Sequence, residues 1–253
     1  MLCVLAAAIP APAQQLKGGI KGKGFGWVWG KDDEVGALNA ILAPERVKQA
    51  LASVKTGRVF DLGVPLDQHS YKWPGHSATA IMSYRTPENV RRMGDVAGWK
   101  GVDALPGMFP ITSKELKGAL AAQKVDVEPG DIVLVRTGTL RYWGKNGSDH
   151  AKIAEHDSAG ITLEAAKWLV EEKGAVMIGA DTSGIEVGRD PSLPGAVNAV
   201  HEYLLVEQGV HILEFHNLEQ LAANRTYRFT YVAMTNRLLG AVAGTAMRPI
   251  AIE

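Results

Sequence analysis

A histidine and a glutamate in the last quarter of the chain, His201 and Glu214, are the residues whose types and spacing could do chemistry. A helix over 201–208 would rise about 10–12 Å, and after a turn at Gly209 a strand of about five residues would retrace that distance. Glu214 would then return to the level of His201. A neutral imidazole and a carboxylate that converge from two rigid elements suit a divalent metal ion. The alternative is a simple His–Glu hydrogen bond at a helix end, because two ligands rarely hold a metal.

A second candidate, Asp181, follows the strand predicted over 176–179. Acidic residues at the carboxyl end of a strand in an open α/β sheet often belong to active sites. They cap a helix or a turn at least as often, because a carboxylate accepts hydrogen bonds from free backbone N–H groups. The sequence leaves both interpretations of Asp181 open.

The remaining histidines lie where solvated or structural roles are the ordinary outcome. Two fall in the loop 67–77, two in the mixed-charge stretch 146–158 that is typical of a wet surface loop, and two in or just after the strand predicted over 210–213. In chain order they are His69, His76, His150, His156, His211 and His216. The last of them could cap the helix that follows the strand.

Helices and strands are predicted in alternation around these candidates. A capping box over 112–115 and a threonine cap at Thr162 each begin a helix. Short apolar runs predict buried strands over 132–135, 175–178 and 210–213. Further elements are the helices predicted over 44–54, over 200–208 and from 217, and the strands predicted over 59–62 and 227–235. Strands interleaved with helices in this way predict the α/β class.

The composition excludes two kinds of partner. The chain has 253 residues with 27 Lys and Arg against 27 Asp and Glu, so its net charge is zero and no basic run is available for nucleic acid. No apolar stretch approaches the roughly 20 residues that a membrane-spanning helix needs. The single cysteine, Cys3, rules out an internal disulfide or a thiolate metal cluster.

The amino-terminal residues 1–13 resemble a secretory signal peptide, because a short apolar core is followed by Ala-x-Ala ending at Ala13. The basic residues that usually open such a peptide are missing, so the signal is interpreted as truncated. It predicts a periplasmic or secreted protein, or a cytoplasmic one if the segment is not a working signal. Residues 14–26, rich in Gly and Lys, are predicted to be a flexible lead-in.

From residue 27 onward, segments along nearly the whole chain resemble the cyclase family of metal-dependent hydrolases, which includes bacterial kynurenine formamidase and isatin hydrolase. The segments that carry the resemblance are, in chain order, WGKDDEVGALN (29–39), GRVFDLGVPL (57–66), WPG (73–75), PGDIVLVRTG (129–138), GADT (179–182), the stretch from His201-Glu202 to Glu214, and RPIA (248–251). The resemblance implies a single domain over 27–253 with a swivelling β/β/α fold of the α/β class. It also implies a homodimer or homotetramer.

The same resemblance implies a chemistry. Members of the family bind Zn²⁺ or Mn²⁺ and hydrolyse a C–N bond in a small formamide or cyclic amide, as kynurenine formamidase does with N-formylkynurenine in tryptophan breakdown. His201 and Glu214 match the later histidine and glutamate of the family's metal site. A small-molecule amide is therefore the expected substrate, and the two surviving N and O ligands do not separate Zn²⁺ from Mn²⁺.

One part of the family pattern is missing from this sequence. The motif His-x-Gly-Thr-His-x-Asp, which supplies the other metal ligands, has no counterpart, since no histidine lies between His76 and His150. The family carries several tens of residues where this chain joins Gly94 directly to Asp95, which is interpreted as an internal deletion. The catalytic residues are therefore unknown, although His69 or His76 could substitute.

The missing motif bears on activity, because a metal hydrolase needs at least three protein ligands and an open position for water. The chain as written is expected to bind the metal weakly, or to have lost it, and to show little or no hydrolysis. Three interpretations follow: a family hydrolase whose sequence lost a segment, a non-catalytic scaffold or small-molecule-binding relative, and a damaged remnant that folds poorly.

Overall fold

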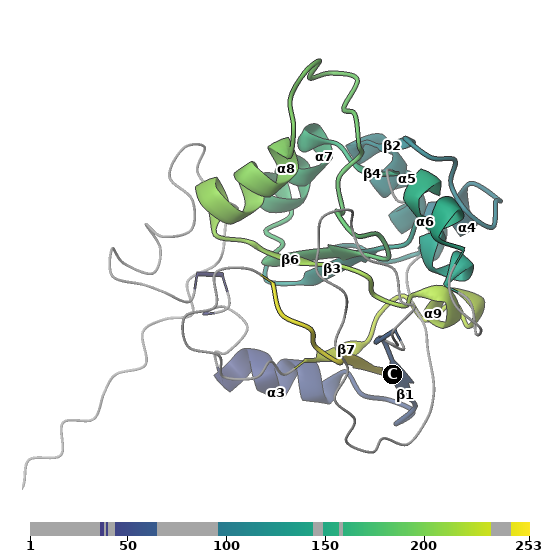
Figure 1. Cartoon of the computed structure of the whole chain (residues 1–253). Coiled ribbons are helices and arrows are strands. Elements are labelled where there is room, and N and C mark those ends of the chain that lie inside the picture. The colour runs from purple at the N-terminus through teal and green to yellow at the C-terminus, as the bar shows by residue number, and fades with distance from the viewer. Residues whose placement is uncertain are drawn as a thin grey trace, which may run out of the picture.

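The structure is a computed structural model that describes residues 36–37, 39, 44–64, 96–143, 149–156, 159–233 and 244–253, with the side chains of residues 155 and 156 left out (Figure 1). Several sequence predictions fall outside these residues. They are the signal peptide 1–13, the lead-in 14–26, the two loop histidines His69 and His76, and the join at 94–95.

A parallel three-stranded sheet lies at the centre of the described fold. It consists of β3 (Ile132–Val135), β5 (Met177–Ala180) and β6 (His211–Leu213), in the order β3-β5-β6. The carboxyl ends of all three strands therefore meet at one edge of the sheet, where Asp181 and Glu214 follow directly. The interleaving of strands and helices confirms the predicted α/β class.

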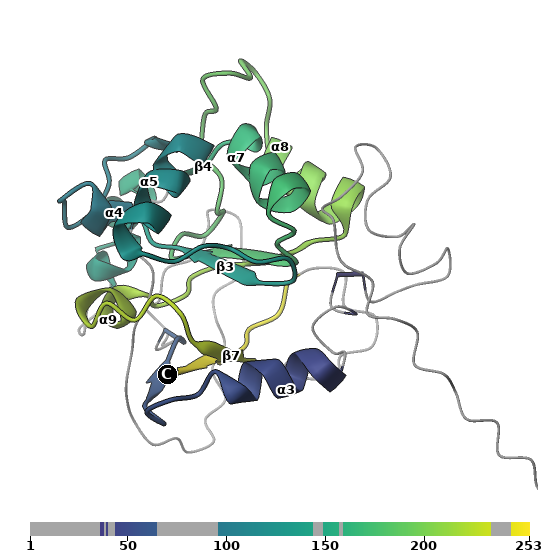
Figure 2. The ribbon, with the colours of Figure 1, turned by 180° about the vertical axis from the view of Figure 1, so that it is seen from behind.

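Helices pack on one face of this sheet, as Figures 1 and 2 show from opposite sides. They are α4 (Val96–Trp99), α5 (Ser113–Gln123), α7 (Leu163–Lys167), which continues into the π-helical η2 (Trp168–Glu172), and α8 (Ala199–His201), which continues into the π-helical η3 (Glu202–Gln208). The main core lies between these helices and the sheet, with Ile111, Leu169, Ile178, Tyr203 and Leu204 among its buried members. No helix in the described part of the chain is long and apolar enough to cross a membrane.

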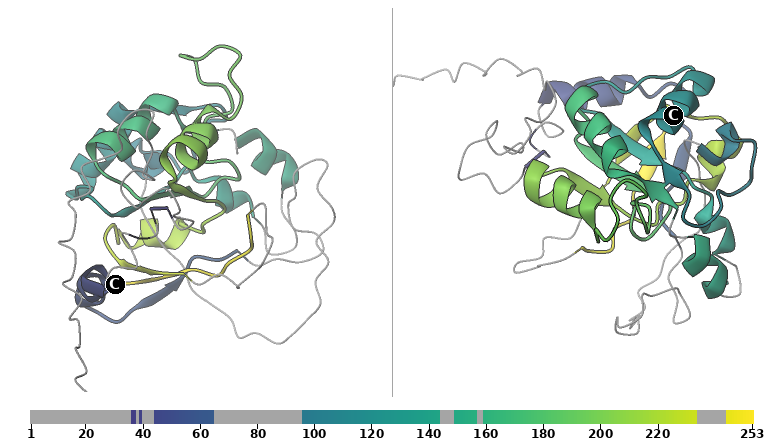
Figure 3. Two further views of the ribbon diagram at one scale, coloured as in Figure 1. Left: turned by 90° about the vertical axis from the view of Figure 1, so that its left-hand side faces the viewer. Right: turned by 90° about the horizontal axis from the view of Figure 1, so that it is seen from above.

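A second layer lies on the opposite face of the central sheet (Figure 3, left). It contains α9 (Glu219–Ala223), α3 (Pro44–Ala52) and an antiparallel sheet of β1 (Val59–Asp61), β8 (Ile250–Ile252) and β7 (Thr230–Val232) in the order β1-β8-β7. A smaller core of Phe60, Leu62, Leu218, Leu221 and Ala251 holds this layer together. The N–H of Asn217 donates to the carbonyl of Leu62 at 2.9 Å and so joins the chain after β6 to the second layer.

Four short elements complete the described structure. The strands β2 (Pro110–Ile111) and β4 (Gly160–Ile161) pair in parallel. The 3-10 turn η1 (Thr139–Tyr142) follows β3, and α6 (His150–His156) follows it. Because α6 is helical, the prediction of a surface loop around His150 is wrong for this segment.

The local signals that predicted the helix starts are visible in the structure. Thr112 Oγ1 accepts from the N–H of Lys114 at 3.2 Å, and the Glu115 carboxylate accepts from the N–H of Thr112 at 3.1 Å. Thr162 Oγ1 likewise accepts from the N–H of Ala165 at 3.2 Å. The predicted capping box and threonine cap are therefore confirmed, because each satisfies backbone donors that a first helical turn leaves free.

Candidate functional site

The structure brings His201 and Glu214 together, with 3.5 Å between His201 Nε2 and Glu214 Oε1. His201 is the last residue of α8, and Glu214 directly follows β6. Both side chains reach solvent, His201 with 28% and Glu214 with 40% of its side-chain surface exposed. The pair is therefore accessible to an ion or a small molecule.

The turn between η3 and β6 explains how the two side chains meet. Gly209 ends η3 at a φ of 64°, and its N–H donates to the carbonyl of Leu204. Glycine adopts this left-handed conformation without the clash that a Cβ would cause. The N–H of Val210 donates to the same carbonyl at 2.7 Å, and the chain then enters β6, parallel to β5. The reversal returns the chain from η3 towards the level of His201, as the residue spacing predicts.

A third residue, Glu186, belongs to the site although the sequence analysis missed it. Its Oε1 contacts His201 Nδ1, and its Oε2 accepts from the N–H of Val200 at 2.9 Å. The available signal was the alternation of Ile185, Glu186 and Val187, because the first and third are buried and the glutamate between them faces the other way. That pattern predicts a strand-like segment but does not name its partner.

The two carboxylates dominate the electrostatics of the site. The contact with Glu186, and then that with Glu214, raise the pKa of His201 to about 9, against the opposing effect of partial burial. In the absence of another cation, the ring is therefore positively charged at neutral pH. The site is built to hold one positive charge between two carboxylates.

His201 and Glu214 offer two of the ligands that a divalent ion would need. Glu186 occupies Nδ1, and Nε2 faces Glu214, so one nitrogen and one carboxylate oxygen could hold Zn²⁺ or Mn²⁺ together. Within the residues that the structure describes, no group of three or more His, Cys, Asp or Glu side chains is arranged to bind a metal. The described part of the chain therefore supplies two ligands of such a site.

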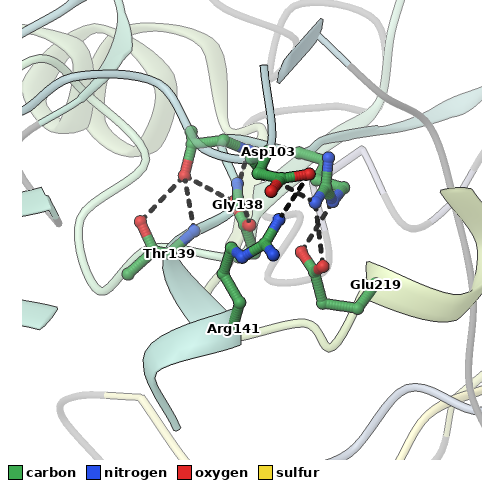
Figure 4. A network of polar contacts seen from close by, with 8 residues as sticks. Asp103, Gly138, Thr139, Arg141 and Glu219 are labelled. Atoms are coloured by element: carbon green, nitrogen blue, oxygen red, sulfur yellow. Dashed lines mark hydrogen bonds and ion pairs between the residues drawn. The ribbon is translucent and has the colours of Figure 1, made fainter. Parts of the chain in front are cut away.

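Asp181 caps the turn that follows β3. Its Oδ1 accepts from the N–H and the hydroxyl of Thr137 at 2.7 and 2.9 Å, and its Oδ2 accepts from the N–H of Gly138 at 2.7 Å. Thr137 Oγ1 also lies 2.8 Å from Thr139 Oγ1, and Figure 4 labels Gly138 and Thr139 within this network. Burial raises the pKa of Asp181 to about 6, although the hydrogen bonds and Arg136 oppose the rise. Of the two open interpretations, the structure favours the turn cap.

An ion-pair network lies beside this cap (Figure 4). Arg136 is almost fully buried, and its Nε and Nη2 lie 2.6 and 2.8 Å from the two carboxylate oxygens of Glu219. Nη2 also donates to the carbonyl of Asp103 at 3.0 Å, while Arg141 Nη1 lies 3.1 Å from the Asp103 carboxylate. The contacts between Arg136 and Glu219 connect the end of β3 to α9. Arg136 and Glu219 therefore have a structural role.

His216 lies close to the site but does not cap the following helix, so that prediction is wrong. Its ring is buried, its Nε2 lies 2.7 Å from the hydroxyl of Tyr231, and its Nδ1 lies 3.2 Å from the carbonyl of Glu214. Burial lowers the pKa of His216 to about 4. A neutral His216 therefore supports the backbone at Glu214. Of the other histidines, His211 lies in β6, His150 begins α6, and the His156 side chain is outside the described residues.

Comparisons with known proteins agree with the fold. The family described as "Putative cyclase" matches residues 74–187. A crystal structure of a novel cyclase is 26% identical, covers 90% of this chain and 97% of its own, and superposes with a TM-score of 0.72. No curated protein matches. The α/β fold and the family match define a cyclase-type scaffold. Residues 74–187 are thus similar to the cyclase family, and the fold is similar to that of the novel cyclase, in agreement with the resemblance seen in the sequence.

Two isatin hydrolase structures are also similar in part. One, bound to the product analogue thioisatinate, is 22% identical with a TM-score of 0.48, covering 64% of this chain and 58% of its own. The other, isatin hydrolase A from Labrenzia aggregata bound to benzyl benzoate, is 22% identical with a TM-score of 0.39, covering 62% and 58%.

Proposed function

We propose that this protein is a cyclase-family, metal-dependent hydrolase of the arylformamidase type, which acts on a C–N bond of a small formamide or cyclic amide. N-formylkynurenine and isatin are the substrates to test first. The observation that carries the proposal is the 3.5 Å approach of His201 Nε2 and Glu214 Oε1 at the positions that match the family's later metal ligands.

The residues of the chain have separate roles in this proposal. His201 would hold Zn²⁺ or Mn²⁺ through Nε2, and Glu214 through its carboxylate. Such an ion, when bound, polarises the carbonyl of the substrate and makes water acidic near neutral pH. The exposed Glu214 side chain leaves the pair open to a small amide. Turnover is expected to be low, because catalytic sites of this kind use three protein ligands.

Elemental analysis of the purified protein, after equilibrium dialysis against buffer that contains Zn²⁺ or Mn²⁺, is the first test. We expect Zn²⁺ or Mn²⁺ to bind the wild-type chain, and the variants H201A and E214A to lose it. The matched control H150A changes the first residue of α6, which lies on the opposite side of the molecule from α8 (Figure 1), and should leave binding intact. Hydrolysis of N-formylkynurenine and isatin is then measured with metal added. Metal binding that survives both H201A and E214A would refute the proposal.

A non-catalytic scaffold that binds a small molecule is the second candidate. It is favoured by the absence of a three-ligand group among the described residues. It predicts a cooperative thermal transition in the metal-free protein and a rise in Tm when a small amide is added, without turnover. Turnover that depends on added metal would exclude it.

Export and self-association complete the proposal. The apolar segment ending at Ala13 supports a periplasmic or secreted location, and the family resemblance supports a homodimer or homotetramer. Fractionation of cells that express the full chain tests the first. Light scattering on the purified protein tests the second.

A further inference from the structure

We propose that Glu186 is a positioning residue, which holds the His201 ring by Nδ1 so that Nε2 is presented to a metal ion beside Glu214. This inference rests on the proposed function, because it assigns a role within the same site. Glu186 lies outside the pair that the family resemblance points to, and it contacts His201 directly.

The geometry of imidazole separates the two glutamates. The two ring nitrogens point in different directions, and Glu186 contacts Nδ1 while Glu214 faces Nε2. An ion bound at Nε2 can therefore be shared with Glu214 but not with Glu186 in its present place. A carboxylate on the far nitrogen of a ligating histidine fixes the tautomer and the ring orientation and makes the ligand more basic.

The second carboxylate oxygen of Glu186 is also engaged. Its Oε2 accepts from the N–H of Val200, in the first turn of α8, at 2.9 Å. The Glu186 carboxylate therefore contacts both the backbone of α8 and the ring of His201, which is the last residue of that helix. The side chain of Glu186 is only 13% exposed, so water competes little for either contact.

Backbone contacts with β4 place Glu186. The N–H of Ile161 donates to the carbonyl of Ile185 at 2.9 Å, and the N–H of Val187 donates to the carbonyl of Ile161 at 3.1 Å. These bonds form a parallel bridge between Ile161 and Glu186. At Gly160, a Cβ would lie 2.4 Å from the carbonyl oxygen of Ile185, so the two segments approach more closely than any side chain permits.

The backbone on both sides of the site is strained. Ile185, directly before Glu186, has a φ of 46°, and Phe215, directly after Glu214, has a φ of 53°. Left-handed φ values are rare for bulky residues, and exceptional for β-branched ones. Such conformations are energetically costly and persist where the surrounding contacts impose them, often at functional sites. The carboxylates of Glu186 and Glu214 are therefore each attached next to a residue with a left-handed backbone conformation.

The test compares E186Q and E186A with the control E207Q, which removes an exposed glutamate from η3, the helical segment that follows His201. Nitrogen-15 NMR of histidine-labelled, metal-free protein reports the Nδ1–H signal of His201. Calorimetric titration with Mn²⁺ and with Zn²⁺ reports affinity. We expect E186A to shift the Nδ1–H signal and to weaken metal binding about 10- to 100-fold. E186Q, which keeps one acceptor oxygen, should fall between E186A and the wild type, and E207Q should match the wild type.

The outcomes separate the two proposals. If E186A binds metal as the wild type does, or leaves the His201 signal unmoved, the positioning role is wrong while the proposed function stands. If the wild-type chain binds neither ion, the proposed function and the positioning role both fail. Circular dichroism of E186A, compared with E207Q, establishes whether the variant is folded. If E186A is unfolded, the comparison of E186Q with E207Q decides by the same two readouts.

Discussion

The carboxylate of Glu219, at the first turn of α9, pairs with both Nε and Nη2 of Arg136, at 2.6 and 2.8 Å. The pair joins the end of β3, in the central sheet, to the layer on the other face of that sheet. Arg136 is nearly buried, so the Glu219 carboxylate compensates its charge where water has little access.

Removing Glu219 should be strongly destabilising. We expect E219A to lower the free energy of unfolding by about 3 kcal/mol, because it removes the carboxylate that pairs with a buried guanidinium. Urea denaturation followed by circular dichroism measures the loss. The control E128Q breaks an exposed pair with Arg228 and should cost about 0.5 kcal/mol or less. Equal effects of the two variants would contradict the importance of burial.

Asp181 should make the stability depend on pH. Burial raises its pKa to about 6 from 3.8, so the native state holds this proton more tightly than the unfolded state does. The contribution of protonated Asp181 to the free energy of unfolding is therefore complete below about pH 4. It is lost as the pH rises through about 6. We expect the wild type to lose up to about 3 kcal/mol relative to D181N across that window. Urea unfolding of both proteins at four pH values between 4 and 7 checks this, and parallel curves would contradict it.

Gly160 should act on the metal site without touching it. In G160A the new methyl group would meet the backbone of Ile185 and Glu186 at 2.4 Å and displace the glutamate. We expect metal affinity to fall by about tenfold, with a stability loss of about 1–3 kcal/mol. Calorimetric titration with Mn²⁺ provides the measurement.

A matched glycine in the same region is available as the control for that variant. A Cβ at Gly184 meets nothing within 4 Å, so G184A should bind metal as the wild type does. A loss of affinity in G184A equal to that in G160A would show that the loop, rather than the approach of β4, controls the site.

Position 124 should accommodate glycine better than the lysine that the chain has there. It ends α5 in the left-handed conformation with a φ of 55°, and its side chain is exposed. We expect K124G to raise the free energy of unfolding by about 0.5 kcal/mol, because glycine adopts this conformation without strain. The contrast is A122G, inside the same helix, which should cost about 1 kcal/mol. Thermal unfolding compares the two, and a lower Tm for K124G would contradict the prediction.

Local patterns in the sequence predicted much of the fold. The capping box at Thr112 and the cap at Thr162 depend on neighbouring residues, and the apolar runs of β3, β5 and β6 depend on burial along one strand. The approach of His201 and Glu214 followed from the rise of a helix and a strand per residue. Such features are set within a few residues or by simple geometry.

The parts that the sequence did not predict depend on distant contacts. Glu186 reaches His201 because β4 fixes its backbone and because Ile185 adopts a left-handed φ. Neither the bridge to β4 nor this φ is predicted by the neighbouring residues. His216 was expected at a helix start, yet its partner is Tyr231 on the other sheet. Both contacts arise from packing between elements that are far apart or conformationally unusual.

The π-helical turn of η3, which begins directly after His201, limits which mutations this region can accept. Each residue of an α-helix advances the side chains by about 100° around the axis. Deleting one residue between His201 and Gly209 would tighten the segment towards an α-helix and rotate the imidazole away from both glutamates. The exposed positions Leu205 and Val206 can therefore vary in side chain, while the length of the segment cannot. Insertions and deletions, rather than substitutions, are the changes to which this region is most sensitive.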